Sequence, residues 1–222
     1  MKDDSLAVMR QQMVEIIGAH AVHAQEQIGK ETLAPRILDA MGCVPRHEFV
    51  PVELIAYAYS DQPLPIGHSK TISQPFIVAL MTDLLDIQPE HSVLEVGTGL
   101  GYHAAILASL AARVFSVEVV EELAAAARRK LSSLGFSEVA LKVGNGEFGW
   151  PEHAPFDRVL VCAASELIPG ALLQQLRPGG KMVVPTGVPE AQVLTLVEKS
   201  AQGRISVKEI MPVRFALLET AN

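Results

Sequence analysis

Three glycines at alternating positions carry the clearest chemical meaning in this sequence. Gly97, Gly99 and Gly101 follow a short apolar segment and precede a run rich in alanine and leucine, which predicts a turn between a strand and a helix. Glycine permits a tight turn and lets a ligand approach the backbone without meeting a Cβ atom. Glu118 follows Gly97 by 21 positions, at the end of the next predicted strand, where a carboxylate can bind both hydroxyls of a ribose. Either feature alone also suits a structural turn or a solvated acid, but together they predict a nucleoside cofactor.

The residues around the glycines indicate which cofactor to expect. The dinucleotide fingerprint GxGxxG places its last glycine one residue further on and commonly serves a pyrophosphate. Here Glu95 precedes the first glycine, and its charge would repel a pyrophosphate but attract a sulfonium or ammonium group. The segment resembles motif I of class I methyltransferases, which bind S-adenosyl-L-methionine and release S-adenosyl-L-homocysteine. That class places a residue bonded to the adenine amino group after the third strand. The residues expected to hold the cofactor are Glu95, Gly97, Thr98, Gly99, Gly101, Glu118, Asn145 and Gly146.

Alternating strands and helices would position this turn. The predicted strands cover residues 93–96, 114–117, 139–143, 158–162 and 182–184, and the predicted helices cover 102–111, 121–134 and 171–176. Residues 192–198 and 205–215 are expected to close the sheet as an antiparallel pair. This order predicts an α/β fold with a doubly wound, mostly parallel seven-stranded sheet, Rossmann-like and covered on both faces. Ligands of such sheets bind beyond the carboxyl ends of the strands, at the switch point.

The first 75 residues have a different texture. Residues 6–17 and 35–43 have helical periodicity, four prolines between Pro45 and Pro65 predict an irregular loop, and residues 76–85 resume the helical pattern. We therefore expect a helical N-terminal extension with a substrate-side loop over residues 1–75. Residues 76–222 would form the cofactor-binding domain, and both parts would make one compact unit.

Several segments outside the glycine turn resemble the protein-L-isoaspartate O-methyltransferase family. They are residues 44–51, 64–68, 71–75, 149–157, 175–180 and 213–215. The likeness covers nearly the whole chain, and its most specific part is the Thr-Ile-Ser-Gln-Pro segment at 71–75, which most class I methyltransferases lack. The resemblance implies methylation of the free α-carboxylate of L-isoaspartyl residues in damaged proteins. The ester then cyclises without help to a succinimide, which can reopen as normal aspartate.

The resemblance also assigns roles to residues near the acceptor. Ser73 falls on the serine regarded as the active-site residue of the family, and Thr71 would shape the same wall. The chain departs from the family pattern at three positions. Asn145 stands where members often have aspartate, Cys162 where many have threonine, and Ser69 where glycine is frequent.

Methylation of a carboxylate makes modest demands on protein side chains. A carboxylic acid with a pKa of about 4 is already ionised at neutral pH, so no general base is needed. The protein has to align the oxygen with the methyl group and strip water from the anion, for which the hydroxyls of Ser73 and Thr71 suffice. His68 and His103 are expected to be structural or solvent-facing rather than bases, and Trp150 is expected to pack or to line the cofactor pocket. Ser73 has no GxSxG elbow around it, which argues against a hydrolase.

Composition excludes several other classes. A net charge of −7 with a pI near 5.5 disfavours nucleic-acid binding. No apolar run suits a membrane span and no signal peptide is recognisable, while Cys43 and Cys162 are too far apart for a CxxC pair. We therefore expect a cytoplasmic monomer without a metal, acting on isoaspartyl proteins and peptides. Two alternatives stay open: a methyltransferase for another carboxylate, and a binding module that holds the cofactor without turnover.

Overall fold

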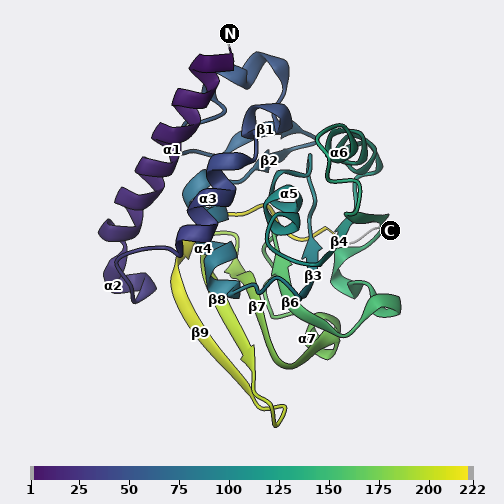
Figure 1. Ribbon diagram of the computed structural model, residues 1–222. Coiled ribbons are helices and arrows are strands. Elements are labelled where there is room, and N and C mark those ends of the chain that lie inside the picture. Colours follow the sequence, from purple (N-terminus) through teal and green to yellow (C-terminus); the bar gives the residue numbers. More distant parts are fainter. Residues whose placement is uncertain (1–2, 220–222) are drawn as a thin grey trace.

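A seven-stranded sheet forms the centre of the computed structural model, which describes residues 3–219 (Figure 1). Its strand order is β5-β4-β3-β6-β7-β8-β9. Along this order, the strands β5, β4, β3, β6 and β7 pair in parallel. Strand β8 pairs antiparallel with β7 and with β9. The strands are β3 (Ser92–Val96), β4 (Arg113–Glu118), β5 (Ala140–Val143), β6 (Phe156–Val161), β7 (Leu176–Val188), β8 (Ala191–Lys199) and β9 (Ile205–Val213). The predicted mostly parallel sheet with a closing antiparallel pair is therefore confirmed.

Helices cover both faces of this sheet. The α-helices are α1 (Asp3–His23), α2 (Gln25–Ile28), α3 (Pro35–Cys43), α4 (Pro75–Leu85), α5 (Tyr102–Ala108), α6 (Glu121–Ser133) and α7 (Gly170–Gln175). Short 3-10 helices are η1 (Arg46–Phe49), η2 (Val52–Tyr57), η3 (Gly146–Phe148) and η4 (Pro151–His153). No helix within residues 3–219 is both long and apolar enough to cross a membrane.

Alternation along the central strands explains the two layers. Every residue of β3 and β6 is buried, as expected for parallel strands covered on both faces. Neighbouring side chains of a strand point to opposite faces. Accordingly Val93 packs into a core with α4, α5 and α6, whereas Leu94 packs into a second core with α7.

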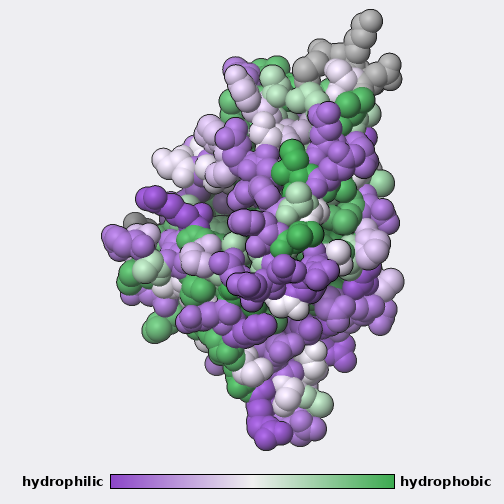
Figure 2. All heavy atoms as spheres, turned by 90° about the vertical axis from the view of Figure 1, so that its left-hand side faces the viewer, coloured by the Kyte–Doolittle hydropathy of each residue, from purple (hydrophilic) through white to green (hydrophobic). Residues whose placement is uncertain are grey.

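The N-terminal helices pack against the first of these cores. Helix α1 runs along one side of the molecule (Figure 1) and contacts α3 and α4. Met13 and Ile17 of α1 are fully buried in the same cluster as Leu80 of α4. The outward face of this side is mostly hydrophilic, with apolar areas between polar ones (Figure 2). A boundary at residue 75 stays a prediction, and its two sides share a core.

The predicted irregular loop before α4 is partly wrong, because it contains a β-hairpin. Strands β1 (Leu64–Gly67) and β2 (Lys70–Ile72) pair antiparallel. His68 and Ser69 form the turn with φ of 52° and 56°, the left-handed backbone that two-residue hairpin turns require. Asparagine and glycine are the usual residues there, so the sequence carried no turn signal. This hairpin delivers Thr71 to the site described below.

Three element boundaries also differ from the prediction. The helix predicted over 102–111 ends at Ala108, and α1 extends well beyond the predicted 6–17. Strand β7 begins at Leu176, directly after α7, where the sequence predicted the end of a helix and then a Pro-Gly-Gly turn. The proline and glycines at 178–180 lie at a register shift between β6 and β7, where a break in the ladder tolerates them.

Candidate active site

The sheet reverses its winding between β3 and β6, and the glycine turn lies at this switch point. Strands β4 and β5 lie to one side of β3, while β6 and β7 lie to the other. The Gly97 N–H donates to the carbonyl of Val117 at 2.8 Å, and the Cys162 N–H donates to the carbonyl of Val96 at 2.8 Å. The turn after β3 and the segment after β6 therefore leave the sheet side by side, which opens a crevice between them.

A cavity of about 710 Å³ occupies this crevice. Its volume lies within the range of small-molecule and cofactor sites. Its walls come from the glycine turn, the end of β4, the start of η3, the hairpin segment before α4, and the stretch after β9. The predicted site residues that line it are Thr71, Ser73, Gly97, Gly99, Glu118 and Gly146. Residues expected to hold the cofactor and residues expected to meet the acceptor thus share one space.

Glu118 is the acid that faces this cavity. Its side chain is largely buried at the end of β4. One carboxylate oxygen accepts from the N–H of Gly99 at 2.7 Å, and the other accepts from the N–H of Val120 at 3.0 Å. Each oxygen retains a second lone pair. The group is therefore fixed in orientation and still able to accept two hydroxyl groups.

The glycines leave room that any other residue would fill. A Cβ atom on Gly99 would lie 3.1 Å from Cδ1 of Ile66, and Gly99 has φ of 56°. A Cβ atom on Gly146 would lie 2.3 Å from Cγ1 of Val96, a distance that no side chain tolerates. Both glycines line the cavity, and the close packing of Ile66 and Val96 against them excludes larger residues. The space, the glycine backbone along its wall and the fixed acid fit an adenosyl cofactor.

Gly101 has a different task. It is the N-cap of α5 with φ of 98°, and a Cβ atom there would lie 3.1 Å from Cγ of Leu131. The third glycine therefore allows the start of α5 to pack closely on α6. It is not among the residues that line the cavity.

Glu95 lies beneath the turn rather than in the cavity. Its side chain is fully buried, and this burial raises the pKa of the carboxyl group to about 8. Ser116 donates a hydrogen bond to it, and the Ser116 hydroxyl lies 2.5 Å from that of Thr98. Glu95 is not among the residues that line the cavity, so its expected contact with the cofactor stays a prediction. Its contacts indicate that it supports the turn from below.

Asn145 likewise stands behind the cavity wall. Its side-chain oxygen accepts from the N–H of Glu147 at 2.9 Å and caps η3. Gly146, the next residue, reaches the cavity. Aspartate and asparagine both cap a helix in this way, so the departure at position 145 preserves the local backbone.

The acceptor side is held by a buried arginine that the sequence analysis did not single out. Arg46 is fully buried; it donates to the carbonyl of Ser73 and to that of Ala58, both at 2.8 Å. Its guanidinium carbon lies 4.9 Å from the ring centre of Tyr102, and burial lowers its pKa to about 10. Arg46 fixes the backbone at Ser73 without touching the cavity. The sequence signal for Arg46 was its position in segment 44–51, one of the segments that resemble the family.

Neither of the two histidines considered as bases lines the main cavity. His68 is exposed in the hairpin turn. His103 is buried; its Nε2 lies 2.8 Å from the hydroxyl of Thr82, and burial lowers its pKa to about 3. Trp150 packs edge-on against Phe115 and is not among the residues lining the cavity.

Comparison with known proteins places this arrangement in a family. The family model described as protein-L-isoaspartate(D-aspartate) O-methyltransferase matches residues 19–221. A protein-L-isoaspartate O-methyltransferase 1 of a Polaromonas species is 55% identical over 221 residues, which is 100% of this chain and 94% of that protein. One of Cupriavidus necator is 50% identical over 97% of this chain and 84% of its own length.

Solved structures agree with this sequence likeness. A structure of a protein-L-isoaspartate O-methyltransferase matches with a TM-score of 0.80 and 26% identity, over 94% of this chain and 65% of that chain. A Plasmodium falciparum protein solved in complex with S-adenosyl-L-homocysteine has the same fold, with a TM-score of 0.80 at 21% identity, over 96% of this chain and 99% of that chain. The chain therefore belongs to the protein-L-isoaspartate(D-aspartate) O-methyltransferase family.

Proposed function

We infer that this chain methylates the free α-carboxylate of L-isoaspartyl residues, with S-adenosyl-L-methionine as the methyl donor. The products are the methyl ester and S-adenosyl-L-homocysteine, and the ester starts repair through a succinimide. The observation that carries the inference is the shared cavity: the glycine turn, Glu118 and Ser73 line one space. This space occurs in a chain that is 55% identical to a family member over its full length.

The cofactor side of the cavity follows from the fixed groups. Glu118 would accept the two ribose hydroxyls with the lone pairs that Gly99 and Val120 leave free. Gly97, Gly99 and Gly146 would lie against the rest of the cofactor, because they line the same cavity as Glu118. Thr98, Gly101, Glu95 and Asn145 would act from behind by shaping the turn and η3. When bound, the cofactor supplies a methyl group already activated by a sulfonium.

The acceptor side needs orientation more than acid–base chemistry. Ser73 and Thr71 line the cavity with hydroxyl groups that can donate one hydrogen bond each to a carboxylate oxygen. Such weak donors position the anion while leaving a lone pair of the attacking oxygen free. Lys70, the cation nearest in sequence, is paired with Glu219 at 2.5 Å. That ion pair offsets the positive charge of Lys70, which lines the same cavity.

The partners of the reaction follow from the same geometry. An isoaspartyl carboxylate must enter a cavity walled by Ser73 and the glycine turn, so the residue has to lie in a flexible or unfolded segment. One chain supplies every residue named here, which supports action as a monomer. The negative net charge argues against nucleic-acid partners, and the free thiols of Cys43 and Cys162 suit the reducing cytoplasm.

A pair of synthetic peptides tests the proposal. One contains a single L-isoaspartyl residue and the other contains aspartate at the same position, and both are incubated with methyl-labelled cofactor. We expect label in the isoaspartyl peptide alone, and we expect that label to be lost in mild base as the ester cyclises. Equal labelling of both peptides would support the broader carboxylate methyltransferase, and bound cofactor without transfer would support the binding module.

A further inference from the structure

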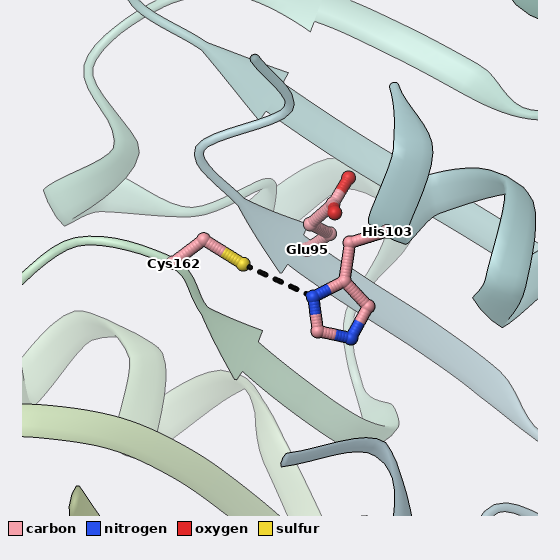
Figure 3. A group of neighbouring side chains, drawn as sticks. All are labelled: Glu95, His103 and Cys162. Atoms are coloured by element: carbon pink, nitrogen blue, oxygen red, sulfur yellow. Dashed lines mark hydrogen bonds between the residues drawn. The ribbon is translucent and has the colours of Figure 1, made fainter. Parts of the chain in front are cut away.

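Three potential metal ligands meet beneath the cofactor turn, although they lie far apart in the sequence. Glu95 comes from β3, His103 from α5 and Cys162 from the segment after β6 (Figure 3). One ligand atom of each lies within 4.8 Å of the other two. The sequence predicted no metal site, because the two cysteines form no CxxC pair. The spacing along the sequence does not indicate that the fold brings Cys162 close to a histidine and a carboxyl group.

The hydrogen bonds of His103 determine which of its nitrogens is free. Thr82 has one hydroxyl proton and donates it to the carbonyl of Val78 at 2.7 Å. The same hydroxyl lies 2.8 Å from Nε2 of His103, so it must accept there, and Nε2 carries the ring proton. The lone pair is therefore on Nδ1, which faces Sγ of Cys162 at 3.7 Å. Metal-binding histidines are oriented in this way, with the distal N–H donated to a fixed acceptor.

The third group offers an oxygen without a partner. Among the described residues, Oε1 of Glu95 is one of two buried side-chain polar atoms that have no hydrogen bond. Its side chain is fully buried, and an unpaired buried oxygen of this kind is costly. Figure 3 shows Glu95 as a neighbour of His103 and Cys162. One carboxyl oxygen of Glu95 lies in the same small cluster as a ring nitrogen of His103 and the sulfur of Cys162.

We propose that Glu95, His103 and Cys162 form a binding site for a thiophilic divalent cation of the zinc type. Zn–S and Zn–N bonds of roughly 2.3 and 2.0 Å at a tetrahedral angle put sulfur and nitrogen about 3.5 Å apart. The Sγ–Nδ1 separation of 3.7 Å already matches this geometry. A carboxyl oxygen of Glu95 lies within 4.8 Å of the other two ligand atoms, and rotation about its side-chain bonds would bring it to the ion.

The charges balance in the bound state. The ion would displace the thiol proton of Cys162 and the carboxyl proton of Glu95, both released to solvent. The thiolate and the carboxylate then neutralise the two positive charges, and the neutral imidazole adds its lone pair. A neutral complex is the form that a buried site tolerates best.

The site also has an entrance and room for a fourth ligand. Cys162 is half-buried and lines the cofactor cavity, so an ion can reach its sulfur from there. A second, smaller cavity of about 50 Å³ is lined by His103, Cys162 and Ser73, which leaves space for a water molecule. The inference does not depend on the methylation reaction.

Cadmium titration tests the proposal, because a cadmium–thiolate bond gives an ultraviolet charge-transfer band. The full-length reduced protein is titrated with Cd²⁺ alone, and Zn²⁺ is then added as a competitor. We expect one equivalent of Cd²⁺ per chain with this band, and displacement of Cd²⁺ by Zn²⁺. The exposed thiol of Cys43 provides the matched control: Cys43→Ser should keep the band, and Cys162→Ser should abolish it.

A second variant protects the test against a folding defect in Cys162→Ser. His103→Gln retains the thiol, and we expect its Cd²⁺ affinity to fall at least roughly tenfold, as for loss of an inner ligand or its support. Far-ultraviolet circular dichroism checks that each variant is folded. The proposal is overturned if the wild type gives no band, if the band follows Cys43, or if folded His103→Gln binds Cd²⁺ as tightly as the wild type.

Discussion

Replacing Glu118 by glutamine tests the best-defined group of the cofactor site. Both of its oxygens accept backbone N–H groups, from Gly99 at 2.7 Å and from Val120 at 3.0 Å. Glutamine has the same shape but one acceptor oxygen, so its NH2 group must face one of these two donors. The change therefore disturbs the turn and also removes the charge that would bind the ribose.

The size of each effect follows from the hydrogen bonds involved. One buried N–H without an acceptor costs about 1–3 kcal/mol of unfolding free energy. That cost lowers the melting temperature by roughly 2–4 °C per kcal/mol in a chain of this size. A hydrogen bond to a charged group contributes about 1.5–3 kcal/mol, so S-adenosyl-L-homocysteine should bind roughly 10- to 100-fold more weakly to Glu118→Gln.

Calorimetric titration of folded wild type and variants measures this change. The matched control is Glu121→Gln, an exposed acid in the first turn of α6. Its affinity should stay within about twofold of wild type, as for a surface substitution. An affinity of Glu118→Gln equal to that of Glu121→Gln would refute the assignment of Glu118 to the ribose.

Three further outcomes are expected. Ser73→Ala should lower kcat for an isoaspartyl peptide roughly 10- to 100-fold, through loss of a hydrogen bond to the anion, and should change S-adenosyl-L-homocysteine affinity much less. Ser69→Gly should raise the unfolding free energy by about 1 kcal/mol in urea titrations, because serine is strained at φ of 56°. Glu95→Gln should flatten the pH dependence of stability: the folded pKa of about 8 lies above the unfolded one, so the folded state holds an extra proton between these values. Wild-type stability then falls as pH rises, by up to about 3 kcal/mol between pH 5 and pH 8, and the variant should lack this loss.

Each of these outcomes has a result that contradicts it. An unchanged kcat in Ser73→Ala removes Ser73 from the reaction. The control for Ser69→Gly is Ser137→Gly, an exposed serine outside the left-handed region, which should gain nothing; equal gains at both positions would argue against turn strain. Parallel stability curves for wild type and Glu95→Gln from pH 5 to pH 8 would show that the Glu95 carboxyl group does not titrate in this range.

The fold was predictable where one physical signal dominated. Strands β3 and β6 are short, mostly apolar segments, and burial on both faces of a parallel sheet produces that pattern. The hairpin β1–β2 was missed because Ser69 adopts a left-handed backbone without the residue type that announces it. The early start of β7 at Leu176 was missed because this strand runs through a Pro-Gly-Gly segment, and pairing with β6 overrides the local preference there.

The part of the site that follows a sequence motif was predictable. The spacing of Gly97, Gly99 and Glu118 predicts a cofactor site, and all three residues line one cavity. The burial of Glu95 was not visible, because a strand residue before the turn can face either the cavity or the core. Arg46 and His103 owe their roles to contacts with Ser73 and Cys162, which lie far away in the sequence.

Equilibrium dialysis with labelled S-adenosyl-L-homocysteine tests the central claim most directly, because it counts bound ligand without depending on heat or turnover. The claim is that the cavity between the glycine turn and Ser73 holds this molecule. We predict saturation at one equivalent per wild-type chain, with markedly weaker binding to Glu118→Gln. No saturable binding to the folded wild type would contradict the account, whatever family the chain belongs to.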